Sequence, residues 1–143
     1  MNQQMLESRQ NAISLEHVTV ADAMHPGVVS CPRETPLQTV AWMMAVYRIH
    51  SVVVVGDTDL WGVVSDLDLV AAESAGGLED LTAGGTAVTP VVLVEPHDTL
   101  AHASQLMSEH EITHLVVVGA ESTHPIGILS TLDVARVLGG VRR

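Results

Sequence analysis

The sequence of 143 residues contains no lysine and no phenylalanine, and aromatic residues make up only 2% of it. The basic residues are six arginines against 17 acidic residues, which gives a formal net charge of −11. A surface with this charge repels phosphate backbones and anionic lipids, so we predict no nucleic-acid partner and no membrane partner. With so few aromatic side chains, the core must be built from Val, Leu, Ile, Met and Ala.

Cysteine is also scarce, because Cys31 is the single one in the sequence. One cysteine excludes an internal disulfide and any cysteine-rich metal site, and we expect Cys31 to be a small buried residue in a strand. No apolar run reaches the ~18 residues that a transmembrane helix needs. The N-terminal residues 1–10 are polar and lack the hydrophobic core of a signal peptide. These features predict a cytoplasmic protein.

One stretch occurs twice, as Gly62-Val63-Val64-Ser65-Asp66-Leu67-Asp68 and Gly127-Ile128-Leu129-Ser130-Thr131-Leu132-Asp133. Other matches precede it: Pro26 with Pro90 and Pro32 with Pro96 at an offset of 64, then Leu37 with Leu100 and Met44 with Met107 at an offset of 63. The duplicated stretch itself has an offset of 65. The offset between matching residues changes only twice, once at a helix start and once in a turn, where changes of length are tolerated. This regularity indicates an internal duplication.

Hydrophobic spacing predicts the same element order in each copy. In the first copy we expect a strand over 28–31, a helix capped by Thr35, a hairpin over 52–64 and a helix over 66–73. The first helix should bury Leu37, Val40, Met44 and Tyr47. The fold class is therefore α+β, with two βαββα repeats packed sheet to sheet about a pseudo-two-fold axis. The expected division is a tail over 1–16, repeats over 17–73 and 81–138, a glycine-bracketed linker over 74–80 and a tail over 139–143.

This order of elements resembles a tandem pair of cystathionine-β-synthase (CBS) domains, the regulatory unit called a Bateman module. The resemblance covers roughly residues 17 to 138. The segments that carry it are Ala23–Pro26, Thr35–Leu37, Ile49–Val55 and Gly62–Asp68, and in the second copy Val88–Pro90, Asp98–Leu100, Ile112–Val118 and Gly127–Asp133.

The resemblance implies a homodimeric sensor that requires no cofactor. It would bind an adenosine-containing ligand (AMP, ADP, ATP or S-adenosylmethionine) in the cleft between the repeats and signal to a separate, unknown target protein. The motif aspartates would hold the ribose hydroxyls, the serines would contact ribose or phosphate, apolar residues would line the adenine, and histidines would meet phosphates. The implied ligand-binding residues are Ser65, Asp66, Asp68, Ser130, Thr131, Asp133, His50, His114, Val28, Val29, Val52, Val91, Val92 and Leu115. Because histidines replace the usual Lys or Arg, a triphosphate is expected less than AMP, adenosine or S-adenosylmethionine.

Other interpretations of the same residues stay open. Ser65 with Asp68, and Ser130 with Asp133, also have the spacing of a helix capping box, which needs no ligand. The chain could then be a ligand-free dimeric scaffold. His110 and His114 raise a third possibility, a histidine-based metal or pH sensor, although we assign no metal ligands. No nucleophile elbow, phosphate-binding loop or acid–base pair is present, so we predict no enzymatic activity.

Overall fold

A computed structural model describes residues 14–120 and 124–141. Contacts divide the chain into two compact units. We call Gly27–Val92 the first unit, and Met1–Pro26 with Leu93–Arg143 the second unit. Among the helices described, none is long and apolar enough to cross a lipid bilayer.

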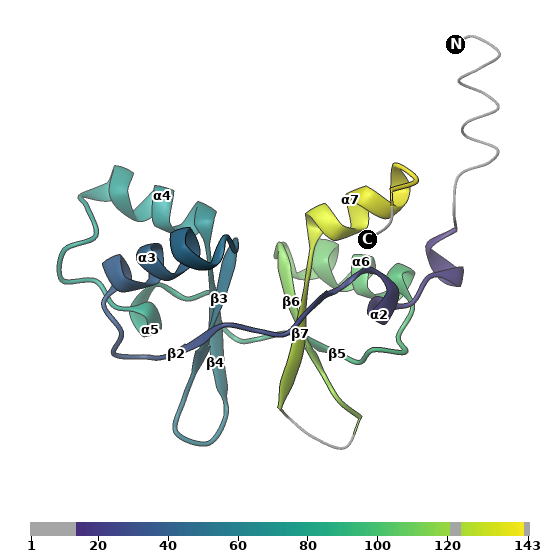
Figure 1. Cartoon of the computed structure of the whole chain (residues 1–143), viewed down its shortest axis with the longest axis horizontal. Coiled ribbons are helices and arrows are strands. Elements are labelled where there is room, and N and C mark those ends of the chain that lie inside the picture. The colour runs from purple at the N-terminus through teal and green to yellow at the C-terminus, as the bar shows by residue number, and fades with distance from the viewer. Residues whose placement is uncertain (1–13, 121–123, 142–143) are drawn as a thin grey trace, which may run out of the picture. The chain divides into compact units, whose positions relative to one another are not determined.

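The first unit is a three-stranded sheet with helices on one side of its hairpin (Figure 1). The sheet order is β2-β3-β4, with β2 parallel to β3 and β3 antiparallel to β4. Its core is aliphatic and includes the buried Cys31, as expected. Its elements are β2 (Ser30–Pro32), α3 (Leu37–Tyr47), β3 (Ser51–Val55), β4 (Leu60–Ser65), α4 (Asp66–Ala75) and α5 (Ala83–Thr86).

The second unit repeats this plan with one additional short strand. The sheet order is β1-β7-β6-β5, with β5 parallel to β6 and β6 antiparallel to β7. The mixed α/β class and the two βαββα repeats are therefore confirmed. The elements are η1 (Leu15–His17), α2 (Val20–Ala23), β1 (His25–Pro26), β5 (Leu93–Val94), α6 (Leu100–His110), β6 (His114–Val118), β7 (Pro125–Ser130) and α7 (Thr131–Leu138).

The apolar stripe of α3 is one residue shorter than we predicted. Leu37, Val40 and Met44 are buried, but Tyr47 is 55% exposed. The helix ends directly after Tyr47, where Arg48 adopts a left-handed conformation (φ 56°). Tyr47 therefore lies at the end of the helix, where the stripe no longer faces the sheet.

The glycine-rich segment 83–85, which we expected to bracket a linker, is part of helix α5. Thr82 caps this helix by accepting a hydrogen bond from the backbone N–H of Gly85 at 3.2 Å. Backbone hydrogen bonds attach it to the first unit, from Leu37 N–H to Leu81 O at 2.9 Å and from Ala83 N–H to Thr35 O at 2.8 Å. Local capping and tertiary pairing thus outweigh the low helix propensity of glycine.

Helix α2 is attached to the second unit by the matching bonds. Leu100 N–H donates to Val18 O and Val20 N–H donates to Asp98 O, both at 2.8 Å. The segment that opens each sequence repeat therefore packs in the unit formed by the rest of the other repeat. The compact units, as a result, do not coincide with the sequence repeats.

Strand pairing also corrects the alignment of the two repeats. Ser30 pairs with Val53, and Leu93 pairs with Val116, so this part of the chain has the same offset as Leu37 with Leu100. The helix N-caps agree, because Pro36 caps α3 and Thr99 caps α6. Matching the prolines at an offset of 64 was therefore wrong by one position, and Thr35 is not the cap of α3. A single change of offset, in the hairpin turn, separates the two copies.

Candidate functional site

The candidate site is the turn from strand to helix that closes each repeat. In the first unit, Ser65 is the N-cap of α4, and its backbone N–H donates to Asp68 Oδ2 at 2.7 Å. The Ser65 hydroxyl donates to the same oxygen at 3.0 Å and accepts from Asp68 N–H at 3.3 Å. In the second unit, Ser130 and Asp133 make the same three bonds at 2.8, 3.0 and 3.2 Å. The capping box is thus present in both turns.

These bonds restrict what the two serines can do for a ligand. Each hydroxyl proton is already directed to the aspartate, so the remaining capacity of the oxygen is that of an acceptor. A phosphate group offers mainly acceptor oxygens, whereas a ribose hydroxyl can donate. The capped serines therefore suit contact with ribose better than contact with phosphate.

The first-turn N–H groups of α4 are all engaged. Asp66 N–H donates to His50 O at 3.0 Å, Leu67 N–H donates to Asp66 Oδ1 at 2.9 Å, and Asp68 N–H donates to the serine. Helix N-termini bind anions through such N–H groups when these are free. The start of α4 thus offers no open donor of this kind, and it carries two carboxylates.

The start of α7 differs at the second of these positions. Thr131 N–H donates to Thr113 O at 3.0 Å, which matches Asp66 in the first unit. Thr131 replaces Asp66, however, and within the described residues Leu132 N–H has no partner corresponding to the Asp66 carboxylate. The second turn therefore keeps one N–H and one hydroxyl toward solvent without the extra negative charge.

The two motif carboxylates also have different surroundings. The side chain of Asp133 is 3% exposed, and its Oδ1 lies 3.5 Å from Nη1 of Arg136. Asp68 is half-buried, and alanine stands at the position of that arginine. Among the described residues, Asp68 uses Oδ2 for the cap and has no partner at Oδ1. Asp68 therefore presents a carboxylate oxygen that a ligand can reach.

Each motif glycine lies where another segment of the chain crosses so closely that a larger residue would not fit. A Cβ on Gly62 would lie 2.7 Å from Val88 O and 2.8 Å from the Ala87 Cβ. A Cβ on Gly127 would lie 2.8 Å from His25 O. The chain segments that leave each unit pass directly over these glycines. The structure therefore fills the space beside each motif glycine with the chain itself.

The six apolar residues implied to line the adenine are either fully buried in a core or half-buried in extended segments. Val52 belongs to the aliphatic core of the first unit, and it and Leu115 are fully buried at 0% exposure. The other four are half-buried and lie in the extended segments before β2 and β5. The first unit contains Val28, Val29, His50, Val52, Ser65, Asp66, Asp68, Val91 and Val92, and the second unit contains His114, Leu115, Ser130, Thr131 and Asp133.

The two histidine candidates do not occupy equivalent positions. His50 lies just before β3, and its Nδ1 is 3.2 Å from Asp66 Oδ2. His114 is the first residue of β6, pairs with Ser130, and has its Nδ1 2.9 Å from the Thr113 hydroxyl. Thr113 is therefore the counterpart of His50. The structure brings His50 together with Asp66 next to the capped aspartate of the first turn.

Sequence reasoning missed the features that distinguish the two turns. The Asp66 carboxylate that caps Leu67 N–H, and Arg136 beside Asp133, both lie close to the motif in the sequence. A comparison of the two copies position by position would have found them, because Asp66 aligns with Thr131 and Ala71 with Arg136. The segments crossing Gly62 and Gly127 carry no local sequence signal.

A model of the CBS domain matches this chain twice, over residues 20–75 and over residues 83–140. The chain belongs to the CBS domain family. Both matches include a capped strand-to-helix turn, so each turn lies within a CBS domain of the pair.

Several known CBS proteins are similar to this chain. Hypoxic response protein 1 of Mycobacterium tuberculosis is 28% identical over 123 residues, which cover 84% of this chain and 85% of that protein. A crystal structure of Hypoxic Response Protein I with two coordinated zinc ions is 27% identical, with a TM-score of 0.66 over 83% of this chain and 98% of that one.

Two solved structures with lower identity share the fold. One is a CBS domain pair in complex with 5′-methylthioadenosine and S-adenosyl-L-methionine, with 19% identity and a TM-score of 0.74 over 86% of this chain and 97% of that one. The other is the CBS domain of a bacterial CNNM/CorC family Mg²⁺ transporter in complex with ATP, with 20% identity and a TM-score of 0.72 over 96% of each chain.

Proposed function

We propose that this CBS pair is a regulatory protein that binds an adenosine-containing ligand and signals to a separate protein. The observation that carries the proposal is the half-buried carboxylate of Asp68, which the cap holds through Oδ2 and which has no partner at Oδ1 among the described residues. Ligand-dependent change would follow from a difference in affinity between two arrangements of the chain. The AMP, ADP, ATP and S-adenosylmethionine expected from the sequence are all candidates.

Asp68 is the proposed ribose ligand. The two neighbouring hydroxyls of ribose are both hydrogen-bond donors, and an ionised carboxylate is purely an acceptor. The capped geometry holds Asp68 before any ligand arrives, so little side-chain entropy is lost on binding. Ser65 supports the same contact, because its oxygen can accept one further hydrogen bond.

The charge around the first turn favours a ligand with no phosphate there. Asp66 and Asp68 stand on the first turn of α4, and the N–H groups that would hold a phosphate are already bonded. Adenosine or S-adenosylmethionine, whose sulfonium is positive, fits this environment better than ATP. A phosphate would suit the second turn better, where Thr131 replaces Asp66 and the Arg136 side chain is 41% exposed.

The similar structures support the ligand class. One CBS pair of the same fold is in complex with 5′-methylthioadenosine and S-adenosyl-L-methionine, and another CBS domain is in complex with ATP. These ligands share an adenosine moiety and differ in charge. The shared moiety is what we transfer to this chain, and charge is the property by which it would select among them.

Thermal unfolding of the full chain with adenosine, S-adenosylmethionine, AMP, ADP, ATP and NAD tests the proposal. A ligand at 100 times its Kd adds about 2.7 kcal/mol to the free energy of unfolding. We expect the largest shift with adenosine or S-adenosylmethionine and the smallest with ATP. Asp68→Asn should reduce the shift, to about half at that ligand concentration if Kd rises ~10-fold, and Glu73→Gln, at an exposed position of the same helix, should keep it. No shift with any of the six compounds would refute the proposal.

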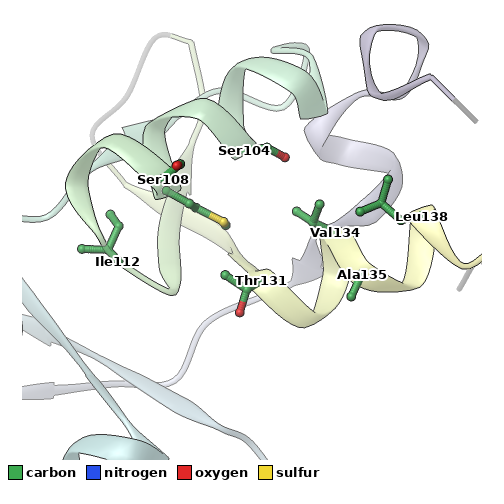
Figure 2. Close-up of a pocket in the computed structure, with 8 residues that line it drawn as sticks. Ser104, Ser108, Ile112, Thr131, Val134, Ala135 and Leu138 are labelled. Carbon is green, nitrogen blue, oxygen red and sulfur yellow. The ribbon is translucent and has the colours of Figure 1, made fainter.

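Homodimer formation is the second part of the proposal, and it would also serve the alternative function of a ligand-free scaffold. An apolar groove runs between α6 and α7 in the second unit (Figure 2). No charged side chain among the described residues lines it, and its small residues allow another helix to approach closely. The lining residues are Ser104, Met107, Ser108, Ile112, Thr131, Val134, Ala135 and Leu138.

We propose a second copy of the chain as the occupant of this groove, because helices from two identical grooves can pack against each other without burying charge. Sedimentation equilibrium measures the mass directly. We expect a dimer for the natural chain and a monomer for Ala135→Arg, which places a charge in the groove, with Ala71→Arg on exposed α4 as the control. A monomer at every concentration would refute this assembly.

A further inference from the structure

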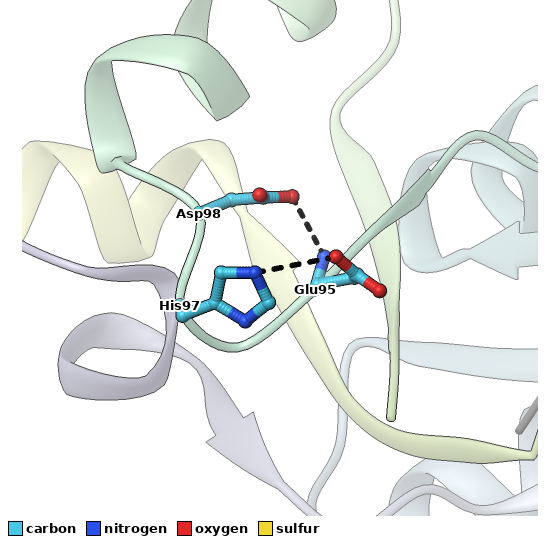
Figure 3. A group of neighbouring side chains, drawn as sticks. All are labelled: Glu95, His97 and Asp98. Atoms are coloured by element: carbon cyan, nitrogen blue, oxygen red, sulfur yellow. Dashed lines mark hydrogen bonds and ion pairs between the residues drawn. The ribbon is translucent and has the colours of Figure 1, made fainter. Parts of the chain in front are cut away.

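A separate group of three side chains lies in the loop between β5 and α6. Glu95, His97 and Asp98 each offer one ligand atom, and these atoms lie within 4.8 Å of one another (Figure 3). None of the three belongs to the strand-to-helix turns. The group also excludes His110 and His114, the pair that the sequence had suggested for a metal.

We propose that Glu95, His97 and Asp98 bind a divalent transition-metal ion of the zinc type. One imidazole nitrogen with two carboxylate oxygens is a donor set that such ions accept, and three protein ligands leave a position for water. The two carboxylates also neutralise the positive charge of the ion, whereas a pair of neutral histidines would not.

The distances suit an ion of this size. His97 Nε2 lies 3.4 Å from Glu95 Oε2. Neighbouring ligands around an ion with bonds of about 2.0–2.2 Å are separated by roughly 3.0–3.6 Å. These two atoms therefore already have the separation that zinc requires, and all three ligand atoms lie within 4.8 Å of one another.

The loop is held in this shape by hydrogen bonds on both sides. Glu95 N–H donates to Asp98 Oδ2 at 2.8 Å, which orients that carboxylate and leaves its other oxygen for the ion. Asp98 N–H donates to Glu95 O at 3.1 Å, and Ala21 N–H of α2 donates to Pro96 O at 2.8 Å. Partners of this kind orient metal ligands before the ion binds. The N-terminus of α6 follows the loop and disfavours a cation, and the two carboxylates offset this effect.

The first unit provides an internal comparison. In the alignment set by strand pairing, the counterparts of the three ligands are Pro32, Glu34 and Thr35, which include no imidazole and a single carboxylate. The intervening Arg33 guanidinium lies 4.6 Å from the centre of the Trp61 ring. The same loop therefore carries a cation of its own in the first unit, and the proposal applies to the second unit alone.

The test is isothermal titration of the full chain, freed of metal by chelation, with ZnCl₂ and separately with MgCl₂. We expect one Zn²⁺ per chain and at least ~10-fold weaker binding of Mg²⁺, which prefers oxygen ligands and retains its waters. His97→Ala should weaken Zn²⁺ binding by at least ~100-fold, since even outer-shell changes cost about 10–100-fold. Glu95→Gln and Asp98→Asn, which keep the shape of the loop, should each weaken it by ~10-fold or more.

His110→Ala is the matched control, because it removes another exposed histidine from the same unit. It should leave Zn²⁺ affinity unchanged. Circular dichroism of each variant verifies that the fold is retained, which is expected because all substitutions are at exposed or half-buried side chains. The proposal is overturned if the natural chain binds no Zn²⁺, if His97→Ala binds it as tightly as the natural chain, or if His110→Ala loses it.

Discussion

The two strand-to-helix turns share one cap but differ in what surrounds it. Asp68 and Asp133 hold the same three hydrogen bonds at closely matching distances. Asp133 is buried beside Arg136, whereas Asp68 is half-buried and follows the acidic Asp66. The cap is therefore sufficient to explain both serines and both aspartates as structural residues. Only the surroundings separate a ligand-binding carboxylate from a structural one.

This difference teaches that a duplicated motif does not imply duplicated function. A capping box stabilises the helix start in either copy, by roughly 0.5–2 kcal/mol. Selection for folding alone would retain it twice. The residue after the serine and the residue three after the aspartate are free of that requirement, and they are the ones that differ.

The largest effects are expected at the glycines that begin the two motifs. Gly62→Ala should lower the free energy of unfolding by about 3 kcal/mol, because its Cβ would meet a carbonyl oxygen and the Ala87 Cβ. Gly127→Ala should cost less, about 2 kcal/mol, because one of its two close neighbours is the flexible Met24 side chain. Urea denaturation measures both values, and equal stability to the natural chain would contradict the crossing of the backbone at these glycines.

For the two motif aspartates, substitution should lower the free energy of unfolding more in the second unit than in the first, which is the reverse of the order for the glycines. Asp133→Ala should cost about 2 kcal/mol, because it removes the cap together with a buried carboxylate that also lies 3.5 Å from Arg136. Asp68→Ala should cost about 1 kcal/mol, because the half-buried Asp68 has only the bonds of the cap to lose among the described residues. Denaturation of the two variants under one set of conditions gives the difference directly. A larger loss for Asp68→Ala would contradict our account of their surroundings.

The smallest effect concerns Cys31, whose counterpart in the second unit is the apolar Val94. Burial raises the pKa of the Cys31 thiol above its ordinary value, and a hydrogen bond with Thr35 lowers it by less. The pKa of the thiol is higher in the folded protein than in the unfolded chain, so folding favours the neutral thiol. Its contribution to the free energy of unfolding is fully present below the unfolded pKa and is lost as the pH rises through the folded pKa. We therefore expect the free energy of unfolding to fall above pH ~9.

Cys31→Ala should remove this alkaline component, although the smaller side chain lowers stability at every pH. Denaturation of both chains on either side of pH ~9 gives the two differences. An identical pH dependence in the natural chain and in Cys31→Ala would show that the thiol does not contribute.

Much of the fold follows from local signals in the sequence. The valine runs, the serine caps and the duplicated turn predicted the two βαββα repeats, because each depends on residues close in the chain. Helix α5 was missed because Gly84 and Gly85 have low helix propensity, and the bonds that hold it come from Thr35 and Arg33, which are distant in the sequence. The proline match failed for a related reason, since only strand pairing sets the register.

The candidate site was predicted in part. The motif residues do form a single structure in each unit, but Val52 is part of the aliphatic core together with Val54 of the same strand. The metal-ligand group was missed because Glu95, His97 and Asp98 follow no helical spacing and converge only when the loop turns back on itself. Such convergence depends on the bond between Glu95 N–H and Asp98, which the sequence does not specify.

The central claim is that Asp68 contacts the ligand and Asp133 serves the fold. Isothermal titration of adenosine into the natural chain, Asp68→Asn and Asp133→Asn tests it most directly, since asparagine keeps the size of the side chain and removes the charge. We predict that Asp68→Asn weakens adenosine binding by at least ~10-fold, the loss of a hydrogen bond to a charged group, and that Asp133→Asn leaves the affinity nearly unchanged. Loss of binding in Asp133→Asn with full binding in Asp68→Asn would contradict the account.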